Sequence, residues 1–388
     1  MAGVRDRAAP VVGIVAGEAS GDILGAHLIE AVRQRCPQVQ FTGICAPRMR
    51  AAGALALYPG EKLAVRGYVE VIKHFPEILS IRRGITRYFL ANPPDVFIGV
   101  DAPDFNLGLE LKLRSAGIPV VHYASPSIWA WRAERINTIK RAVDHMLVLF
   151  PFETEIYDKA GVPATFVGHP LAGVLADYPT RAAVRAKIGL PQDVRVVALL
   201  PGSRQAELTQ LGALMAQAAR IMATQWPGVQ FVAPMVNPET RRQFEAACKQ
   251  MQAPPVLILD GGSHDAMAAA DVVLVASGTA TLEAALLQRP MVITYKVPAL
   301  TAWLTTRKAY VPYLGLPNIL AGEFIVPELL QAAATPQALA DAVIALLNDH
   351  ERCSRITARF AEMAASLRQD TARKAAEVVL PFLQRPRQ

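Results

Sequence analysis

The sequence predicts an α/β protein with two Rossmann-like domains, each built on a parallel sheet. Short apolar runs alternate along the chain with segments of helical spacing. The runs are almost continuously apolar, which is typical of strands that are covered on both faces. The pattern pauses around residues 168–180 and then restarts, and a chain of 388 residues that is 52% hydrophobic has room for two cores.

The first half of the chain shows the repeating strand and helix pattern clearly. Leu24, Leu28, Ala31 and Val32 follow helical spacing directly after the first apolar run. Strand, helix and strand in this order predict a doubly wound parallel sheet. Strands are expected at 11–16, 39–44, 95–100, 119–124, 145–150 and 164–168.

The second half repeats the pattern and ends in helices. Strands are expected at 195–201, 229–234, 256–259, 271–276 and 291–295, and the chain looks helical from about 336. We therefore expect a first domain at 1–170, a second at 171–350, and C-terminal helices at 351–388. Ligands of such folds bind outside the carboxyl ends of the strands, so a cleft between two facing sheets is expected.

Two strand-to-helix turns in the second half suit a diphosphate. In "LPGSR", Gly202, Ser203 and Arg204 combine helix-start amides with a guanidinium. The alternative is an ordinary turn with a surface arginine. In "SGTATLEA", the backbone of Ser277, Gly278, Thr279 and Thr281 can meet a phosphate, and Glu283 can accept hydrogen bonds from a ribose diol; the alternative is a capped core helix.

In the first half, "GVDAPDFN" places Asp101 just after a strand. A carboxylate at that edge can act as a general base. Asp104 and Asn106 follow closely, and for Asp104 a helix N-cap is the preferred interpretation. Nearby, "HYASPSIWAWR" brings Ser125 and Trp129 into one loop, where an aromatic ring suits a sugar or an acyl chain but equally a buried position against the sheet.

Residues 11–22, "VVGIVAGEASGD", form a strand followed by a turn of small residues. Such turns often hold phosphates, so a nucleotide site is one interpretation. The two turns of the second half are better suited to a diphosphate. Gly17 and Gly21 let the backbone approach a ligand closely, and Glu18, Ser20 and Asp22 then lie beside that ligand. His169, in "VGHP", lies at the domain junction, where a lone histidine is usually structural.

Several function classes lose support from the sequence. It lacks GxGxxG, GxxxxGK[ST], GxSxG, HExxH and Asp-x-Asp, so dinucleotide, P-loop, hydrolase and compact metal sites are not expected. The net charge of +7 and the pI near 9.3 indicate an anionic partner: nucleic acid, a phosphorylated substrate or an anionic lipid. No signal peptide and no transmembrane helix are expected.

One basic segment offers a surface for lipid. Within residues 63–89, Val65, Val69, Ile72, Phe75 and Leu79 fall close to helical spacing. The basic side chains interleaved with them are Lys73, Arg82, Arg83 and Arg87. A basic, apolar helix of this kind can lie in a membrane interface. The alternative is a pair of amphipathic helices that pack on the sheet.

Seven motifs together resemble those of the lipid A disaccharide synthases: "GEASGDILGA", "APRM", "GVDAPDFN", "HYASPSIWAWR", "LPGSR", "SGTATLEA" and "LPNILAG". The resemblance runs from about residue 11 to 384, and Ala46 departs from a glycine that is frequent before "PRM". It implies a GT-B fold and an inverting, metal-free transfer without a cofactor. The substrates would be UDP-2,3-diacylglucosamine and 2,3-diacylglucosamine 1-phosphate (lipid X), and the products the β-1,6-linked disaccharide 1-phosphate and UDP.

The resemblance also implies roles for single residues. Asp101 is the expected base on the acceptor's 6-hydroxyl, and Arg204 the expected diphosphate clamp. Residues 277–281 and Glu283 are expected to hold UDP, and Asn318 to bind the nucleotide or close the cleft. The turn at 17–22 is expected to face the acceptor, and the C-terminal helices to cross back onto the first domain or exchange between subunits.

The same resemblance implies partners and a location. The partners are the two lipid substrates and the cytoplasmic face of the inner membrane, with no nucleic acid, and a homodimer is expected. Two other functions stay open: a UDP-sugar 2-epimerase of similar architecture, and a non-catalytic binding protein for phosphorylated glycolipids.

Overall fold

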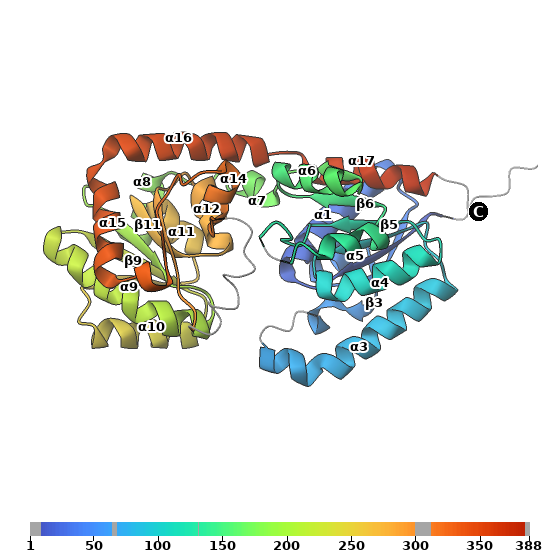
Figure 1. The fold of residues 1–388 in the computed structure, drawn as a ribbon, viewed down its shortest axis with the longest axis horizontal. Helices are drawn as coiled ribbons and strands as arrows, with labels where there is room; N and C mark the ends of the chain where they lie inside the picture. The colour runs from blue at the N-terminus through green and yellow to red at the C-terminus, as the bar shows by residue number, and fades with distance from the viewer. Residues whose placement is uncertain (1–8, 64–67, 131, 299–311, 385–388) are drawn as a thin grey trace, which may run out of the picture. The chain divides into compact units, whose positions relative to one another are not determined.

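The computed structural model describes residues 9–63, 68–130, 132–298 and 312–384. The chain divides into two compact units (Figure 1). Unit 1 comprises Met1–Pro170 together with Leu367–Gln388, and unit 2 comprises Leu171–Ser366. The helical end of the chain is therefore shared: α16 (His350–Leu367) belongs almost entirely to unit 2, whereas α17 (Thr371–Leu383) belongs to unit 1.

Unit 1 is built on a seven-stranded sheet with the order β3-β2-β1-β4-β5-β6-β7, in which every described pair is parallel. The strands are β1 (Val11–Ala16), β2 (Gln40–Cys45), β3 (Leu55–Pro59), β4 (Val96–Val100), β5 (Val120–Tyr123), β6 (His145–Val148) and β7 (Ala164–Phe166). Because the strands are parallel, β1, β4 and β5 end at one edge, and the loops that follow them meet there.

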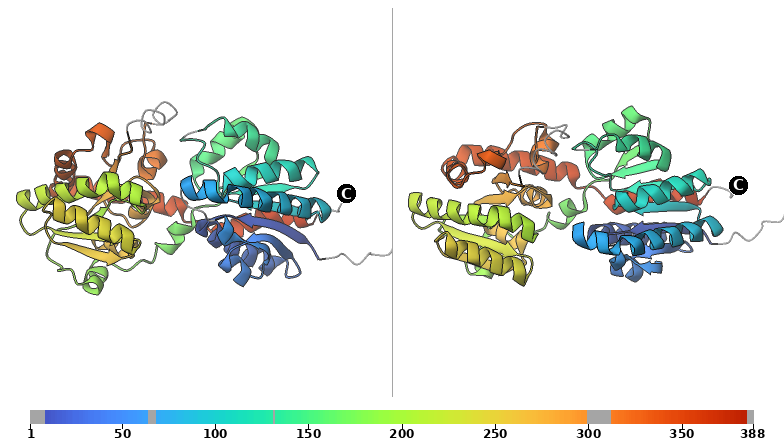
Figure 2. Two further views of the ribbon diagram at one scale, coloured as in Figure 1. Left: turned by 90° about the horizontal axis from the view of Figure 1, so that it is seen from below. Right: turned by 60° about the horizontal axis from the view of Figure 1, so that its bottom comes forward.

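Helices cover both faces of this sheet (Figures 1 and 2). One core lies between the sheet and α1, α2 and α17, and a second lies between the sheet and α3 to α6. Alternate residues of β4 enter the two cores, since Ile98 belongs to the first and Phe97 to the second. The helices are α1 (Ala19–Arg35), α2 (Pro47–Ala51), α3 (Tyr68–Ala91), α4 (Pro103–Ser115), α5 (Arg135–Ala142) and α6 (Pro151–Ala160), with a 3₁₀ turn at Gly60–Lys62.

Unit 2 repeats this architecture with six parallel strands in the order β10-β9-β8-β11-β12-β13. The strands are β8 (Val196–Leu200), β9 (Gln230–Met235), β10 (Val256–Asp260), β11 (Val272–Ala276), β12 (Met291–Tyr295) and β13 (Glu328–Leu330). The helices besides α16 are α7 (Pro170–Val174), α8 (Arg181–Ile188), α9 (Gln205–Gln225), α10 (Pro238–Gln250), α11 (Ser263–Ala269), α12 (Thr279–Leu286), α14 (Leu316–Ala321) and α15 (Pro336–Asn348), with a 3₁₀ turn at Gln331–Ala333. The structure thus confirms the predicted class of two parallel α/β sheets.

The basic segment at 63–89 corresponds largely to α3. Its C-terminal half packs on the second core of unit 1, where Ile81, Ile85 and Phe89 are buried, whereas Phe75 is 57% exposed. Val65 lies outside the described residues, and for 68–74 only the helical backbone is described. In the described parts of the chain, no helix combines the length and the apolar character that crossing a membrane requires.

Candidate functional site

Asp101 stands in a strained turn at the end of β4. Asp101 has φ 53° and Ala102 has φ 44°, and such conformations cost a non-glycine residue about 1–3 kcal/mol. Asn106 holds the turn, because its Nδ2 donates to the carbonyls of Asp101 (2.8 Å) and Val100 (3.3 Å). Asn106 is fully buried, so its role is to position the Asp101 turn.

The small-residue turn after β1 packs against Asp101. A Cβ on Gly17 would lie 2.8 Å from the Cβ of Ala102, so only glycine lets the two turns approach this closely. The next turn of chain brings Ser20, whose Oγ donates to Oδ2 of Asp101 at 3.3 Å. Gly21 also lies close to β4, since a Cβ on Gly21 would be 3.5 Å from the carbonyl oxygen of Val100. The turn therefore belongs to the Asp101 site.

The two acidic residues of that turn have different environments. Glu18 is the exposed N-cap residue of α1. Asp22 is 5% exposed, and its two carboxylate oxygens accept from the backbone N–H groups of Arg48 and Met49 at 3.0 Å each. The carboxylate of Asp22 thus caps α2 inside unit 1 instead of facing the acceptor.

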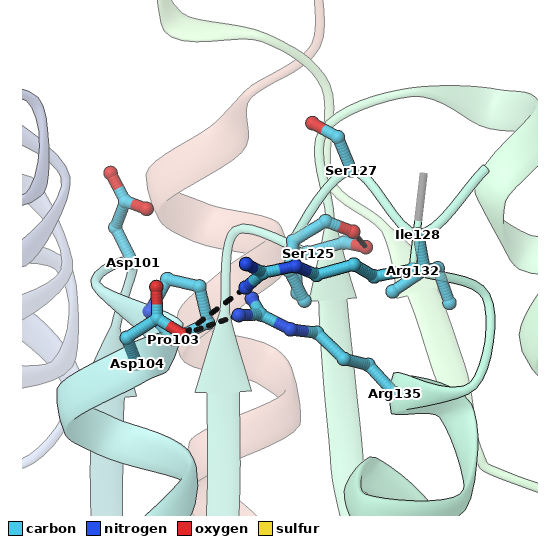
Figure 3. Close-up of a pocket in the computed structure, with 9 residues that line it drawn as sticks. Asp101, Pro103, Asp104, Ser125, Ser127, Ile128, Arg132 and Arg135 are labelled. Atoms are coloured by element: carbon cyan, nitrogen blue, oxygen red, sulfur yellow. Dashed lines mark hydrogen bonds and ion pairs between the residues drawn. The ribbon is translucent and has the colours of Figure 1, made fainter. Parts of the chain in front are cut away.

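Asp101 lines a pocket of 230 Å³ at the carboxyl edge of the unit 1 sheet (Figure 3). Arg132 and Arg135 extend across its wall and form ion pairs with Asp104, and the Asp101 carboxylate points away from them. Ala102 is the N-cap of α4 and Asp104 lies in the first turn, so the N-cap interpretation of Asp104 is wrong. The full lining consists of Asp101, Pro103, Asp104, Ser125, Pro126, Ser127, Ile128, Arg132 and Arg135.

A buried polar network supports the loop that forms this wall. The Oγ of Ser125 lies 2.7 Å from the Tyr157 hydroxyl, and the indole N–H of Trp129 donates to Oε1 of Glu153 at 3.2 Å. Glu153 is 2% exposed and also accepts from the backbone N–H of Phe150. Trp129 is committed to this network and does not line the described pocket. Glu153 escaped the sequence analysis, although it stands at the third position of α6, where a glutamate commonly closes a capping box.

Glu153 makes the stability of unit 1 depend on pH. Burial raises the pKa of Glu153 to about 7, although hydrogen bonds from Phe150, Ser125 and Trp129 oppose the shift. The folded state therefore binds this proton more tightly than the unfolded state, so the contribution of Glu153 to stability is complete below pH 4.5 and is lost as the pH rises through 7. The loss of this contribution amounts to roughly 3 kcal/mol.

Glu153→Gln is expected to remove this slope. Calorimetry at pH 5 and pH 8 gives the free energy of unfolding of the wild type and the variant. Subtracting the variant's change between the two pH values from that of the wild type removes the contributions of all other titrating groups. An equally steep slope in Glu153→Gln would contradict the assignment.

His169 has a structural environment in unit 1. Its ring stacks on Phe150, with centroids 5.5 Å apart, and its backbone N–H donates to the Leu367 carbonyl. His169 thus ties the end of α16 to the segment that follows β7. It does not line the pocket at Asp101.

In unit 2 the two predicted diphosphate turns meet in one pocket of 390 Å³. One wall follows β8 and the other follows β11, which are neighbours in the sheet. The lining consists of Leu200, Gly202, Ser203, Arg204, Glu207, Pro234, Val236, Ser263, Ala276, Ser277, Gly278, Thr279, Ala280, Glu283 and Tyr295. The predicted residues Gly202, Ser203, Arg204, Ser277, Gly278, Thr279 and Glu283 are therefore brought together.

Glu207 organises the first turn and was missed in the sequence. It accepts from the backbone N–H groups of Ser203 (2.8 Å) and Arg204 (3.2 Å), and its other oxygen lies 3.5 Å from Nη1 of Arg204. The Arg204 side chain is 77% exposed, so its guanidinium is accessible to an anion. Glu207 is the third residue of α9, where a glutamate commonly closes a capping box, and this position is the sequence signal that could have revealed it.

Glu283 faces the same pocket and is paired with His264, a second residue that the sequence did not reveal. Their Oε2 and Nε2 atoms are 3.5 Å apart. The hydrogen bond to Glu283 raises the pKa of His264, against the effect of burial. Thr281 is fully buried, and its hydroxyl donates to the Gly278 carbonyl, so it secures the start of α12.

Asn318 acts from behind the pocket. It is fully buried, donates to the Val326 carbonyl and to Glu328, and accepts from the N–H groups of Ile325 and Val326. Glu328 in turn accepts from the N–H of Leu314, whose carbonyl accepts the Ser277 hydroxyl at 3.2 Å. Asn318 thus shapes the segment that borders Ser277 and makes no contribution to the pocket lining.

Within residues 9–63, 68–130, 132–298 and 312–384, no three His, Cys, Asp or Glu side chains are placed to hold a metal ion together.

Solved structures with this fold include sugar-nucleotide enzymes. A glycosyltransferase from Rickettsia africae matches with a TM-score of 0.59 and 9% identity, covering 97% of this chain and 99% of its own. A UDP-GlcNAc 2-epimerase from Neisseria meningitidis, solved with UDP-GlcNAc, matches with a TM-score of 0.58 and 11% identity, covering 96% and 99%. At these identities the likeness concerns the fold, and it confirms the GT-B class.

Sequence relatives are much closer. The family model "Lipid-A-disaccharide synthetase" matches residues 12–382. The lipid-A-disaccharide synthase of Aromatoleum aromaticum is 54% identical over 376 residues, covering 96% of both chains. That of Methylobacillus flagellatus is 52% identical over 376 residues, covering 96% of this chain and all of its own. The chain belongs to the lipid-A-disaccharide synthetase family.

Proposed function

We propose that this protein joins UDP-2,3-diacylglucosamine to 2,3-diacylglucosamine 1-phosphate, forming the β-1,6-linked disaccharide 1-phosphate and UDP. Membership of the family carries lipid-A-disaccharide synthase activity, a glycosyl transfer, to this chain. The observation that supports this chemistry is that the two units present different functional groups. Unit 1 presents Asp101 in a strained turn, and unit 2 gathers two helix-start turns and Arg204 in one pocket.

In the proposed reaction, the Asp101 carboxylate accepts the proton of the acceptor's 6-hydroxyl. The freed oxygen lone pair attacks the anomeric carbon of the donor, and the bond from that carbon to the diphosphate oxygen breaks with inversion. Arg132 and Arg135 line the pocket beside Asp101 and are suited to the acceptor's 1-phosphate. Asp101 thus supplies general base catalysis at the acceptor.

Unit 2 is proposed to bind the donor and stabilise the leaving group. UDP leaves with the electron pair of the broken bond, so negative charge grows on its diphosphate. Arg204 and the N–H groups at the starts of α9 and α12 are the donors available to that charge. Glu283, held by His264, is proposed to accept hydrogen bonds from the ribose hydroxyls.

One assay separates the candidate functions. The protein is incubated with UDP-2,3-diacylglucosamine and lipid X, and UDP and the disaccharide are quantified. Equal amounts of both products support the transferase. Because structural neighbours include a 2-epimerase, UDP-GlcNAc is tested alone for conversion to its 2-epimer. Folded protein that binds both lipids but forms no disaccharide would favour a binding protein instead.

We further propose that α3 docks the protein on the cytoplasmic face of the inner membrane, where both acylated substrates reside. Phe75 is 57% exposed on this helix, and Arg82, Arg83 and Arg87 follow it in the sequence. An exposed aromatic ring beside basic residues suits an anionic lipid surface. A homodimer that exchanges α17 stays a prediction; within this chain α17 packs on α1.

Docking through α3 predicts that Phe75→Ser combined with Leu79→Ser weakens binding to anionic vesicles. Both changes remove apolar surface from the proposed docking helix, and co-sedimentation with phosphatidylglycerol vesicles measures the loss. Leu55→Ser is the matched control, because Leu55 is 64% exposed in the same unit but lies on β3. Equal binding of the double variant and the wild type would assign docking to another surface.

A further inference from the structure

Behind the Asp101 turn lies a pair of ionisable side chains that the reaction does not use directly. Glu110 on α4 and His122 on β5 are both fully buried, and Oε1 of Glu110 lies 2.6 Å from Nδ1 of His122. Buried ion pairs are costly because both partners lose their hydration, and apolar replacements of similar volume are often no less stable. Stability alone therefore does not explain why this apolar sheet contains such a pair.

The fold is adapted to admit the pair. His122 is aligned with Gly99 on β4, and a Cβ on Gly99 would lie 1.9 Å from Oε1 of Glu110. Any side chain at position 99 would expel Glu110 from its place over the sheet. Gly99 and Asp101 are two residues apart at the end of the same strand, so the pair lies on the face of β4 beneath the catalytic turn.

Asn106 connects the pair to the turn. It is one helical turn before Glu110 on α4, and its amide holds the carbonyls of Val100 and Asp101. A Cβ on Gly99 would lie 3.2 Å from the Cβ of Asn106 as well as against Glu110, so Asn106 and Glu110 lie side by side over Gly99. Oδ1 of Asn106, Oε2 of Glu110 and Nε2 of His122 are buried and have no hydrogen-bond partner in the described part of the chain.

The groups around the His122 imidazole include Asp101. Burial lowers the pKa of His122, but the Glu110 carboxylate outweighs it, helped by Asp101 and the Ala124 backbone, so that the net shift is upward. These are the groups that face the imidazole from α4, β4 and β5, and its aligned neighbour on β6 is the uncharged Met146. The strand of His122 also meets the turn directly, because the backbone N–H of Asp101 donates to the carbonyl of Tyr123, the next residue on β5, at 2.8 Å.

We propose that Glu110, His122 and Asn106 form a positioning network for Asp101, which fixes its left-handed turn. The proposal rests on the proposed function of Asp101 as the base. The three residues touch no substrate and act through Asp101. His122 and Glu110 thereby become part of the machinery of the transfer, although they lie in the core.

The test compares His122→Asn and Glu110→Gln, which keep hydrogen-bonding groups but remove a charge, with the wild type. Initial rates are measured in mixed micelles between pH 5.5 and 9. A misplaced base costs up to about a hundredfold, so kcat should fall roughly ten- to a hundredfold with little change in either KM. The split between kcat and KM is the readout that distinguishes positioning from a structural role, because a loss of folded protein would also lower the binding of UDP.

His145→Asn is the matched control. His145 is a half-buried histidine of the neighbouring strand β6 that bonds Thr165 at 2.8 Å, away from the Asp101 turn. Thermal unfolding and calorimetric binding of UDP verify that each variant is folded. Wild-type kcat in both His122→Asn and Glu110→Gln would overturn the proposal, as would an equal loss of kcat in His145→Asn.

Asp101→Asn, measured in parallel, separates this proposal from the proposed function. A wild-type rate for Asp101→Asn would refute the base itself, and the network with it. An inactive Asp101→Asn beside unaffected His122→Asn and Glu110→Gln would overturn the network alone.

Discussion

Asp101→Asn is expected to lower kcat by about 10²–10⁴-fold, the usual contribution of a general base. The amide preserves the shape of the side chain but cannot accept the proton of the attacking hydroxyl. KM for both lipids should change little, because the lost interaction belongs to the transition state. Initial rates of UDP release with saturating substrates measure the effect.

Asp104→Asn provides the control for Asp101. Asp104 lines the same pocket, but its exposed carboxylate is occupied by Arg132 and Arg135. We expect this variant to keep kcat within about an order of magnitude and to raise KM for the acceptor, because the two guanidinium groups lose their anchor. If Asp104→Asn were inactive and Asp101→Asn active, the two carboxylates would have to exchange roles.

Arg204→Ala is expected to lower kcat by about 10²–10³-fold, the usual effect of removing one group that stabilises developing negative charge. The side chain is largely exposed and is drawn only weakly to Glu207, so its loss should leave the fold intact. UDP should also bind more weakly in calorimetry, because the same guanidinium faces the product diphosphate.

Arg242→Ala is the matched control for Arg204. Arg242 is 68% exposed and pairs with Glu239 three residues earlier, but it lies on α10 and does not line the pocket. Wild-type kinetics in Arg242→Ala together with a large loss in Arg204→Ala would support a specific role at the diphosphate. Similar small effects in both would refute it.

The sequence predicted all the inner strands of both sheets, and at the edges it predicted β7 and β10 but missed β3 and β13. The central strands β1, β4, β8 and β11 are continuous apolar runs, and the structure confirms them. The missed strands β3 and β13 are edge strands in which every residue is at least partly exposed, and β13 has only three residues, too few to show a strand pattern.

For the site, sequence motifs located the turns but not the direction of the side chains. The two diphosphate turns meet because β8 and β11 are neighbours, a consequence of parallel topology that the strand order made predictable. Asp22, Asn106 and Asn318 look like ligand contacts in their motifs, yet each is turned inward by backbone groups that need a partner. Such long-range capping depends on tertiary packing, which one sequence does not reveal.

The division of the chain bears on how the protein is made. Unit 1 begins at the N-terminus, but its core against α1 includes Ala375, Ala376 and Val379 of α17. During synthesis, unit 1 therefore starts first and is completed last, after all of unit 2 has been made. A premature stop just before α17 would thus leave the pocket of unit 2 with its full chain and would damage the unit that carries Asp101.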